Sequence, residues 1–303
     1  MSYKLSRRQF AAITLAAACV TLPGATWAKV SDYANPHLLM EPEQLIDMVP
    51  ATKGASSASE TVGLVVVDVR PREQFDEGHI PGARHLDPNA VVARHSPVDG
   101  TLLSVPELEK RLSDLGIAAD RRIVFYDDRG GFHAARMFWL MEYLGHRNVA
   151  ILNGGWSGWR AADGPVSKDE ASFQPAKFQA ALSPRRHASA EDVLGHRHEP
   201  YSVLIDVRPP KMYDEGHIPW AINVPWAKNL GEDGRFLDAE SLLVHFAAFG
   251  IKPKSNVVMH CQNGLASAHS YVALRLLGFP RVRVYHRSWA EWGKDPSLPK
   301  AAS

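Results

Sequence analysis

The side chain best suited to covalent chemistry in this 303-residue chain is the thiol of Cys261. The apolar run at residues 257–260 precedes it, and apolar residues at helical spacing begin at Leu265. A cysteine on a tight loop between a strand and a helix lies where backbone N–H groups converge and the helix dipole attracts anions. We therefore expect this thiol to ionise more readily than an ordinary cysteine and to act as a nucleophile.

The loop after the thiol is expected to hold an anionic sulfur through its backbone N–H groups. Its residues are Gln262, Asn263, Gly264, Leu265, Ala266 and Ser267. Gly264 suits a position that needs a positive φ or a close backbone approach. A buried structural cysteine is the alternative, because free cysteines are among the most buried residues. The position between strand and helix favours the functional interpretation.

The chain contains an internal duplication. The segment LVVVDVRP at residues 64–71 recurs as VLIDVRP at residues 203–209, and FDEGHIP recurs in the same order as YDEGHIP. Farther along the chain, Asp127 aligns with Cys261. Ordered matches at a nearly constant spacing indicate two copies of one domain, of which only the second has the cysteine. The histidines of the repeated segment, His79 and His217, are predicted to brace loops, because one copy lacks the nucleophile.

Each copy is predicted to be an α/β domain with a mainly parallel sheet flanked by helices. Short β-branched runs predict buried strands at residues 64–67, 123–126, 203–205 and 257–259. Helical patterns lie between these strands, and Ser104 with Glu107 forms a capping-box pattern at the start of one of them.

The domain boundaries follow from composition. The polar stretch at residues 167–186 has no clear period and contains two prolines, so it is predicted to be a linker. Residues 36–166 then form the first domain, and residues 187–300 form the second, catalytic domain.

The N-terminus predicts an export signal over residues 1–28. Arg7 and Arg8 precede an apolar run that is too short to span a bilayer, and small residues at cleavage-site spacing end at Ala28. The segment SRRQF resembles a twin-arginine signal. We therefore expect a periplasmic or otherwise exported protein. Lipidation of Cys19 stays open, and cleavage would leave Cys261 without a partner for an internal disulfide.

Charge excludes some partners. The chain has 34 basic and 33 acidic residues without a basic cluster, which argues against nucleic acid and anionic membrane surfaces as partners. No stable membrane insertion is expected after cleavage of the signal. One cysteine and dispersed histidines give no metal-ligand spacing, so no metal site is expected. The oligomeric state is left open.

The chain resembles the rhodanese and 3-mercaptopyruvate sulfurtransferase family over roughly residues 36–299. The segment FDEGHIPGARHL looks like the family's N-terminal signature, VRVYHRSWAEW looks like its C-terminal signature, and the Cys-x-x-Gly loop at Cys261 looks like its catalytic loop. His286 and Arg287 depart from the pattern, where an acidic residue and glycine are usual. The resemblance implies two tandem rhodanese-like domains, with Asp127 in place of the cysteine in a non-catalytic first domain.

The resemblance also implies a mechanism. Cys261 would take the outer sulfur of a small donor as a covalent persulfide, without a cofactor, and pass it to cyanide or a thiol. Family members use an arginine at the position of Arg208 to hold the anionic donor. An ion pair with Asp206 is the other role open to this arginine, and Arg70 in the first domain is predicted to be structural.

Thiosulfate is the expected donor, with 3-mercaptopyruvate as the alternative. Relatives that prefer mercaptopyruvate carry a serine after the cysteine, and Asn263 cannot replace its hydroxyl in proton transfer, although Asp87 and His95 could supply its partners. A non-catalytic sulfur-relay or binding module is a further alternative. A phosphatase of this fold would need an arginine where Ser267 stands.

Overall fold

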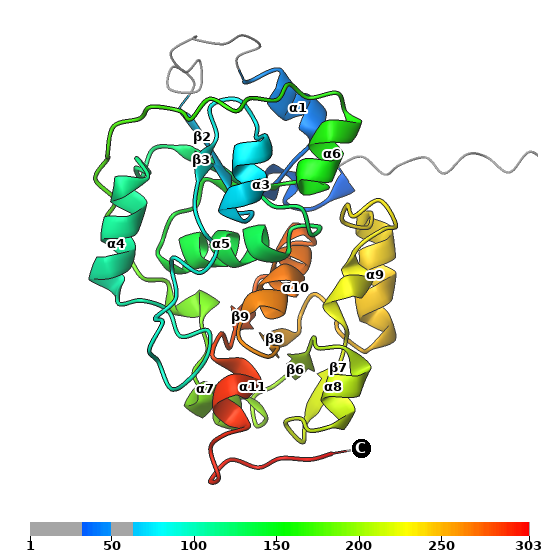
Figure 1. Ribbon diagram of the computed structural model, residues 1–303. Helices are drawn as coiled ribbons and strands as arrows, with labels where there is room; N and C mark the ends of the chain where they lie inside the picture. The colour runs from blue at the N-terminus through cyan, green and yellow to red at the C-terminus, as the bar shows by residue number, and fades with distance from the viewer. Residues whose placement is uncertain (1–31, 50–62, 303) are drawn as a thin grey trace, which may run out of the picture.

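The computed structural model describes residues 32–49 and 63–302 and shows two α/β domains, each built on a parallel sheet (Figure 1). The predicted signal over residues 1–28, with Cys19, lies outside the described residues and stays a prediction. No helix within the described ranges is long and apolar enough to cross a membrane.

The first domain has a five-stranded sheet whose strands are all parallel. In spatial order, the strands are β1 (Leu39–Met40), β5 (Val149–Leu152), β4 (Arg122–Tyr126), β2 (Leu64–Asp68) and β3 (Arg84–His85). The helices and short turns around the sheet are η2 (Pro36–Leu38), α1 (Pro42–Ile46), α3 (Arg72–Glu77), α4 (Val105–Asp114), α5 (Phe132–Tyr143) and α6 (Gly155–Ala161).

The second domain repeats this plan with a four-stranded parallel sheet. In spatial order, its strands are β7 (Ala221–Asn223), β6 (Ser202–Asp206), β8 (Asn256–His260) and β9 (Val282–Val284). Its helices and turns are η3 (Pro184–Arg186), α7 (Ala190–His196), α8 (Pro210–Asp214), η4 (Trp226–Asn229), α9 (Ala239–Ala248), α10 (Leu265–Leu276) and α11 (Ser288–Trp292).

The elements predicted from sequence are confirmed, with strands that extend one or two residues beyond the apolar runs. The capping box before α4 is present. The Ser104 side chain accepts the Glu107 backbone N–H, and the Glu107 side chain accepts the Ser104 backbone N–H. Beyond α10, Gly278 has a φ of +79°, so the chain leaves the helix through a conformation that favours glycine.

The two domains share one hydrophobic core, which passes through the contact between α5 and α10 (Figure 1). Phe138 on α5 and Tyr271 on α10 are fully buried, and their ring centroids lie 6.4 Å apart. Each such side chain contributes roughly 1.5–3 kcal/mol when it leaves water. The domains are therefore joined by packing as well as by the chain.

Residues 168–183 contain no helix or strand and lie along the first domain. The Ala176 N–H donates to the Ser113 carbonyl at 2.9 Å, and the Ala181 N–H donates to the Leu144 carbonyl at 2.8 Å. These bonds fix the segment that leads into the second domain.

His269 on α10 links the two domains from a fully buried position. One ring nitrogen, Nε2, lies 3.1 Å from the Gly130 carbonyl of the first domain, and the ring stacks on Phe236 with centroids 4.6 Å apart. Burial lowers the pKa of His269 from 6.5 to about 4. The imidazole therefore stays neutral in the folded protein at pH values where the unfolded chain takes up a proton.

This difference predicts that the protein loses stability as the pH falls from about 6.5 towards 4. Between pH 7 and pH 5, His269 alone should account for about 2 kcal/mol of unfolding free energy, because the unfolded state binds more protons. Urea unfolding followed by tryptophan fluorescence measures the unfolding free energy at both pH values. For His269→Gln, this free energy should fall by about that much less between pH 7 and pH 5 than for the native sequence. The exposed His95→Gln should behave like the native sequence. Equal losses in both variants would contradict the assignment.

Candidate active site

Cys261 lies at the carboxyl end of β8, on the loop that opens α10. The residue is only 2% exposed, yet polar groups face its sulfur. The Gly264 N–H donates to Sγ at 3.1 Å, and the Ser267 hydroxyl donates to Sγ at 3.6 Å. The thiol is therefore buried beside hydrogen-bond donors, and these donors would stabilise a negative charge on the sulfur.

Gly264 is required by both conformation and space. Its φ is +87°, in the left-handed region that favours glycine. A Cβ at this position would lie 2.5 Å from the His286 carbonyl oxygen, so a side chain would push the loop away from the segment between β9 and α11. The loop reaches its donor geometry because of this close approach.

Ser288, the first residue of α11, supports the loop from behind. The Cys261 N–H donates to the Ser288 Oγ at 3.0 Å, and that hydroxyl donates to the Tyr285 carbonyl at 2.7 Å. Ser288 has a φ of +52°, which is unusual for a residue with a side chain. Its first-domain counterpart is Gly155, with a φ of +54°. A serine thus holds a conformation that glycine adopts more easily, and its hydroxyl lies 3.9 Å from the Cys261 Sγ.

A buried cation from the first domain lies within electrostatic range of Cys261. Arg136 lies on α5 and is 3% exposed. Burial lowers the pKa of its guanidinium to about 10, while the negative charges of Cys261 and Asp99 act in the opposite direction. Arg136 therefore keeps its charge at neutral pH.

The contacts of Arg136 leave part of its guanidinium without a partner. Its Nη2 donates to the Gly100 carbonyl at 2.8 Å, and its Nε is buried without a partner among the described residues. A buried guanidinium with an unsatisfied donor, within electrostatic range of Cys261, is suited to bind an anion near the sulfur.

The first domain shows what the loop geometry can hold. There the Asp127 carboxylate occupies the place of the thiol and accepts four backbone N–H groups. The Oδ1 atom accepts from Arg129 at 2.8 Å and Gly131 at 2.9 Å, and the Oδ2 atom accepts from His133 at 2.6 Å and Ala134 at 3.0 Å. The loop of the first copy is thus a filled anion site whose ligand is its own side chain.

The two loops can be superposed through their glycines. Gly131 has a φ of 89° and precedes α5, as Gly264 has a φ of 87° and precedes α10. His133 and Ala134 then correspond to Ala266 and Ser267. A carboxylate oxygen lies one bond beyond the position of the cysteine sulfur, and so would the outer sulfur of a persulfide. The loop of the second domain is one residue shorter, and this alignment predicts that the N–H groups of Ala266 and Ser267 would face that outer sulfur.

Arg208 has the second of the two roles left open by its sequence. Its guanidinium is 3% exposed on the side chain and pairs with Asp206, with Nη2 and Oδ2 2.6 Å apart. The same Nη2 donates to the Gly216 carbonyl at 2.6 Å. Arg70 makes the equivalent contacts with Asp68 and Gly78 in the domain without a thiol, so this geometry serves the fold. The ion pair with Asp206 is therefore present, and a contact of Arg208 with the donor stays a prediction.

Asn263 ties the loop to the other domain. Its Nδ2 donates to the Asp99 carboxylate at 2.7 Å, so its amide is held by the segment that covers the loop. The neighbouring Gln262 accepts the Ala290 N–H on its carbonyl at 2.8 Å. The backbone of Leu265 begins α10, and the side chains of Ala266 and Ser267 are buried.

Three histidines considered from the sequence make contacts within the fold. His79 and His217 bond the carbonyls of Phe75 and Tyr213, each at 2.9 Å, which confirms that they brace loops. His260 precedes the thiol but is buried beside Asp206, with Nε2 and Oδ2 3.6 Å apart. Asp87 and His95 are exposed.

Arg136 and Ser288 are the site residues that sequence reasoning missed. Ser288 could have been found, because it aligns with Gly155 in the repeat and a serine in place of glycine marks a special position. Nothing in the sequence around Arg136 marks it as a site residue, because it lies on a helix of the other domain. In the described part of the chain, no cluster of three histidine, cysteine or acidic side chains is placed to hold a metal ion.

Comparison with known proteins places both halves in one family. The rhodanese-like domain family matches residues 52–162 and 189–295. A sulfur carrier protein of Thermus thermophilus is 34% identical over 75% of this chain and 86% of its own length. A thiosulfate sulfurtransferase of Azotobacter vinelandii is 31% identical over 89% of this chain and 99% of its own length.

A solved structure agrees. The crystal structure of a 3-mercaptopyruvate sulfotransferase from Escherichia coli superposes with a TM-score of 0.74 at 26% identity, covering 84% of this chain and 99% of that one. The chain therefore belongs to the rhodanese family of sulfurtransferases and carries two rhodanese-like domains.

The filled site of the first domain gives a direct test of the loop geometry. Asp127→Asn should destabilise the protein by about 3 kcal/mol, because two backbone N–H groups would face an amide that cannot accept from them. The neighbouring Asp128→Asn, which removes the same charge, should cost less than about 0.5 kcal/mol. Urea unfolding at pH 7 measures both, and similar losses for the two variants would show that Asp127 does not hold the loop.

Proposed function

We propose that this protein transfers the outer sulfur of thiosulfate to a thiophilic acceptor, such as cyanide or a thiol, through a persulfide on Cys261. The observation that carries this proposal is the loop around the thiol. The equivalent loop of the first domain holds an anion, the Asp127 carboxylate, with four backbone N–H groups. Membership of the rhodanese family supports the same chemistry.

In the first step, the Cys261 thiolate attacks the outer sulfur of thiosulfate. A bond forms between the two sulfurs, the bond within thiosulfate breaks, and sulfite leaves with the electron pair. The N–H groups of Gly264, Ala266 and Ser267 bind the anionic persulfide, and Arg136 supplies a positive charge for the donor. In the second step, cyanide attacks the outer sulfur, thiocyanate leaves, and the thiolate is restored. The scheme is ping-pong.

The choice of thiosulfate over 3-mercaptopyruvate rests on Asn263 and Arg136. The Asn263 amide is bound to Asp99 and has no proton to pass to an enolate, so it offers no substitute for a serine relay. The buried cation of Arg136 suits a small, doubly charged donor. Thiocyanate formation measured with each donor in parallel should give the higher kcat/KM with thiosulfate, and a higher value with mercaptopyruvate would reverse the assignment.

A sulfur carrier that hands its persulfide to another protein is the second candidate, and a relative of that name supports it. The 2% exposure of Cys261 favours small donors and acceptors instead, because a protein thiol would have to reach a covered sulfur. Turnover with cyanide or small thiols in the absence of any partner protein separates the two.

Cys261 is expected to be indispensable. Cys261→Ser should abolish thiocyanate formation, because an alkoxide cannot store a transferable sulfur. Mass spectrometry of the native protein after thiosulfate treatment should show one added sulfur on the Cys261 peptide, and the variant should show none. Undiminished turnover by Cys261→Ser would exclude the persulfide mechanism.

Arg136→Gln should lower kcat/KM for thiosulfate by at least tenfold, because the donor would lose the charge that the first domain contributes. Arg136→Lys should recover part of the loss, since it keeps the charge but not the planar donors. Arg129→Gln, which removes an exposed arginine just before the same helix, should leave kcat/KM within twofold. Equal activity of the glutamine and lysine variants at position 136 would argue against an electrostatic role.

We also propose export of the protein, on the basis of the twin-arginine pattern at Arg7 and Arg8. Fractionation of cells that express the full chain should place the shortened protein outside the cytoplasm. Replacement of both arginines by lysine should retain the longer form inside, and unchanged export would exclude the twin-arginine route.

A further inference from the structure

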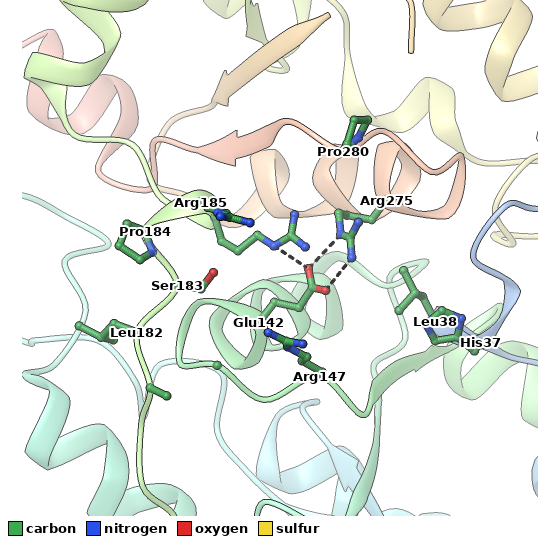
Figure 2. Close-up of a pocket in the computed structure, with 13 residues that line it drawn as sticks. His37, Leu38, Glu142, Arg147, Leu182, Ser183, Pro184, Arg185, Arg275 and Pro280 are labelled. Atoms are coloured by element: carbon green, nitrogen blue, oxygen red, sulfur yellow. Dashed lines mark hydrogen bonds and ion pairs between the residues drawn. The ribbon is translucent and has the colours of Figure 1, made fainter. Parts of the chain in front are cut away.

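A recess of about 730 Å³ lies where the two domains and the connecting segment meet (Figure 2). Its wall is formed by the end of α5 with Glu142, the turn at Arg147, the segment at residues 181–186, and the end of α10 with Arg275. Because α10 begins at the Cys261 loop and ends at this recess, the recess is separate from the candidate active site.

Positive charge dominates the recess. Four arginines line it, namely Arg147, Arg185, Arg186 and Arg275, against a single carboxylate, Glu142. They come from three separate segments, so the fold brings them together and no local run of basic residues explains the cluster.

The Glu142 carboxylate is already paired with two of these arginines, and dashed lines mark these interactions in Figure 2. Its carboxylate accepts from the Arg275 Nε at 3.1 Å and Nη2 at 3.0 Å, and it lies 3.7 Å from the Arg186 Nε. Burial opposes ionisation of Glu142, but Arg275, Arg186 and the Tyr271 hydroxyl hold its pKa below the ordinary value. The carboxylate therefore stays charged and cannot neutralise further arginines.

Arg147 and Arg185 make no hydrogen bond or ion pair with the residues that the structure describes. They are not needed as helix caps either, because other groups already bond the nearby carbonyls. The Ala181 and Ser183 N–H groups bond Leu144 and Tyr143 after α5, and the Asn35 side chain donates to the Arg275 carbonyl at 2.7 Å. Both residues are exposed, so their two guanidinium groups are accessible to a solute at the recess.

We propose that this recess binds a small organic molecule that carries at least two acidic groups, phosphate or carboxylate. Guanidinium groups bind both kinds of group with paired, charge-assisted hydrogen bonds. The exposed apolar side chains of Leu182 and Pro280 offer a surface for the body of the molecule, and the volume suits a ligand of metabolite size. A bound ligand would contact both domains and stabilise their arrangement.

Isothermal titration calorimetry of the full chain with inorganic pyrophosphate, and separately with citrate, tests the site. At least one probe should bind, with an affinity that falls as sodium chloride is raised. Arg147→Gln/Arg185→Gln should weaken that binding at least tenfold. The matched pair Arg111→Gln/Lys252→Gln removes two exposed charges elsewhere and should keep the affinity within twofold. Absence of binding by both probes, or equal weakening in both pairs, would overturn the proposal.

The site and the sulfur transfer can be tested independently. Cys261→Ser should bind the probe as the native protein does, although it forms no persulfide. Arg147→Gln/Arg185→Gln should form thiocyanate at the native rate when no probe is present. Arg136→Gln, which removes the cation near the thiol, should likewise leave the probe affinity unchanged, and an affinity that falls in this variant would show that the anion occupies the sulfur site and not this recess.

Discussion

Backbone N–H groups at the start of a helix bind the Asp127 carboxylate in the first domain, and the candidate site of the second domain has a related loop around Cys261. In the first domain the charge is the Asp127 carboxylate, which stays in place permanently. In the second domain the Gly264 N–H donates to the Cys261 sulfur, and under the proposed function a transferred sulfur would bring the negative charge. Gly264 and Ser288 matter because they shape this loop and not because they react.

The site is assembled from both domains, although the nucleophile belongs to one. Arg136 and Asp99 come from the first domain, and Asn263 on the second domain's loop bonds Asp99 across the boundary. The shared core at α5 and α10 fixes these contacts, because a shift of one helix against the other would move the guanidinium relative to the thiol. The rigid packing between domains is therefore part of the site geometry.

The fold and the nucleophile could be predicted because their signals are local. Alternating strand and helix patterns, the capping box at Ser104 and the glycine at position 264 each depend on a few neighbouring residues. The charge of Arg136 at the thiol and the Asp99 contact of Asn263 depend on how two helices cross, which no spacing along the chain reveals. Arg208 shows the same limit, since only the structure reveals that Asp206 and Gly216 engage its guanidinium.

Where α5 and α10 cross, each helix carries one side chain that extends towards the other domain. Arg136 follows Gly131 by the same number of positions as His269 follows Gly264. The arginine bonds the Gly100 carbonyl within electrostatic range of Cys261, whereas the neutral imidazole reaches the Gly130 carbonyl of the loop already filled by Asp127. The two duplicated halves therefore differ in what they contribute. The second half carries the candidate nucleophile, Cys261, and the first half carries a positive charge, Arg136. Neither half on its own contains both Cys261 and Arg136, so the proposed reaction needs the two halves together.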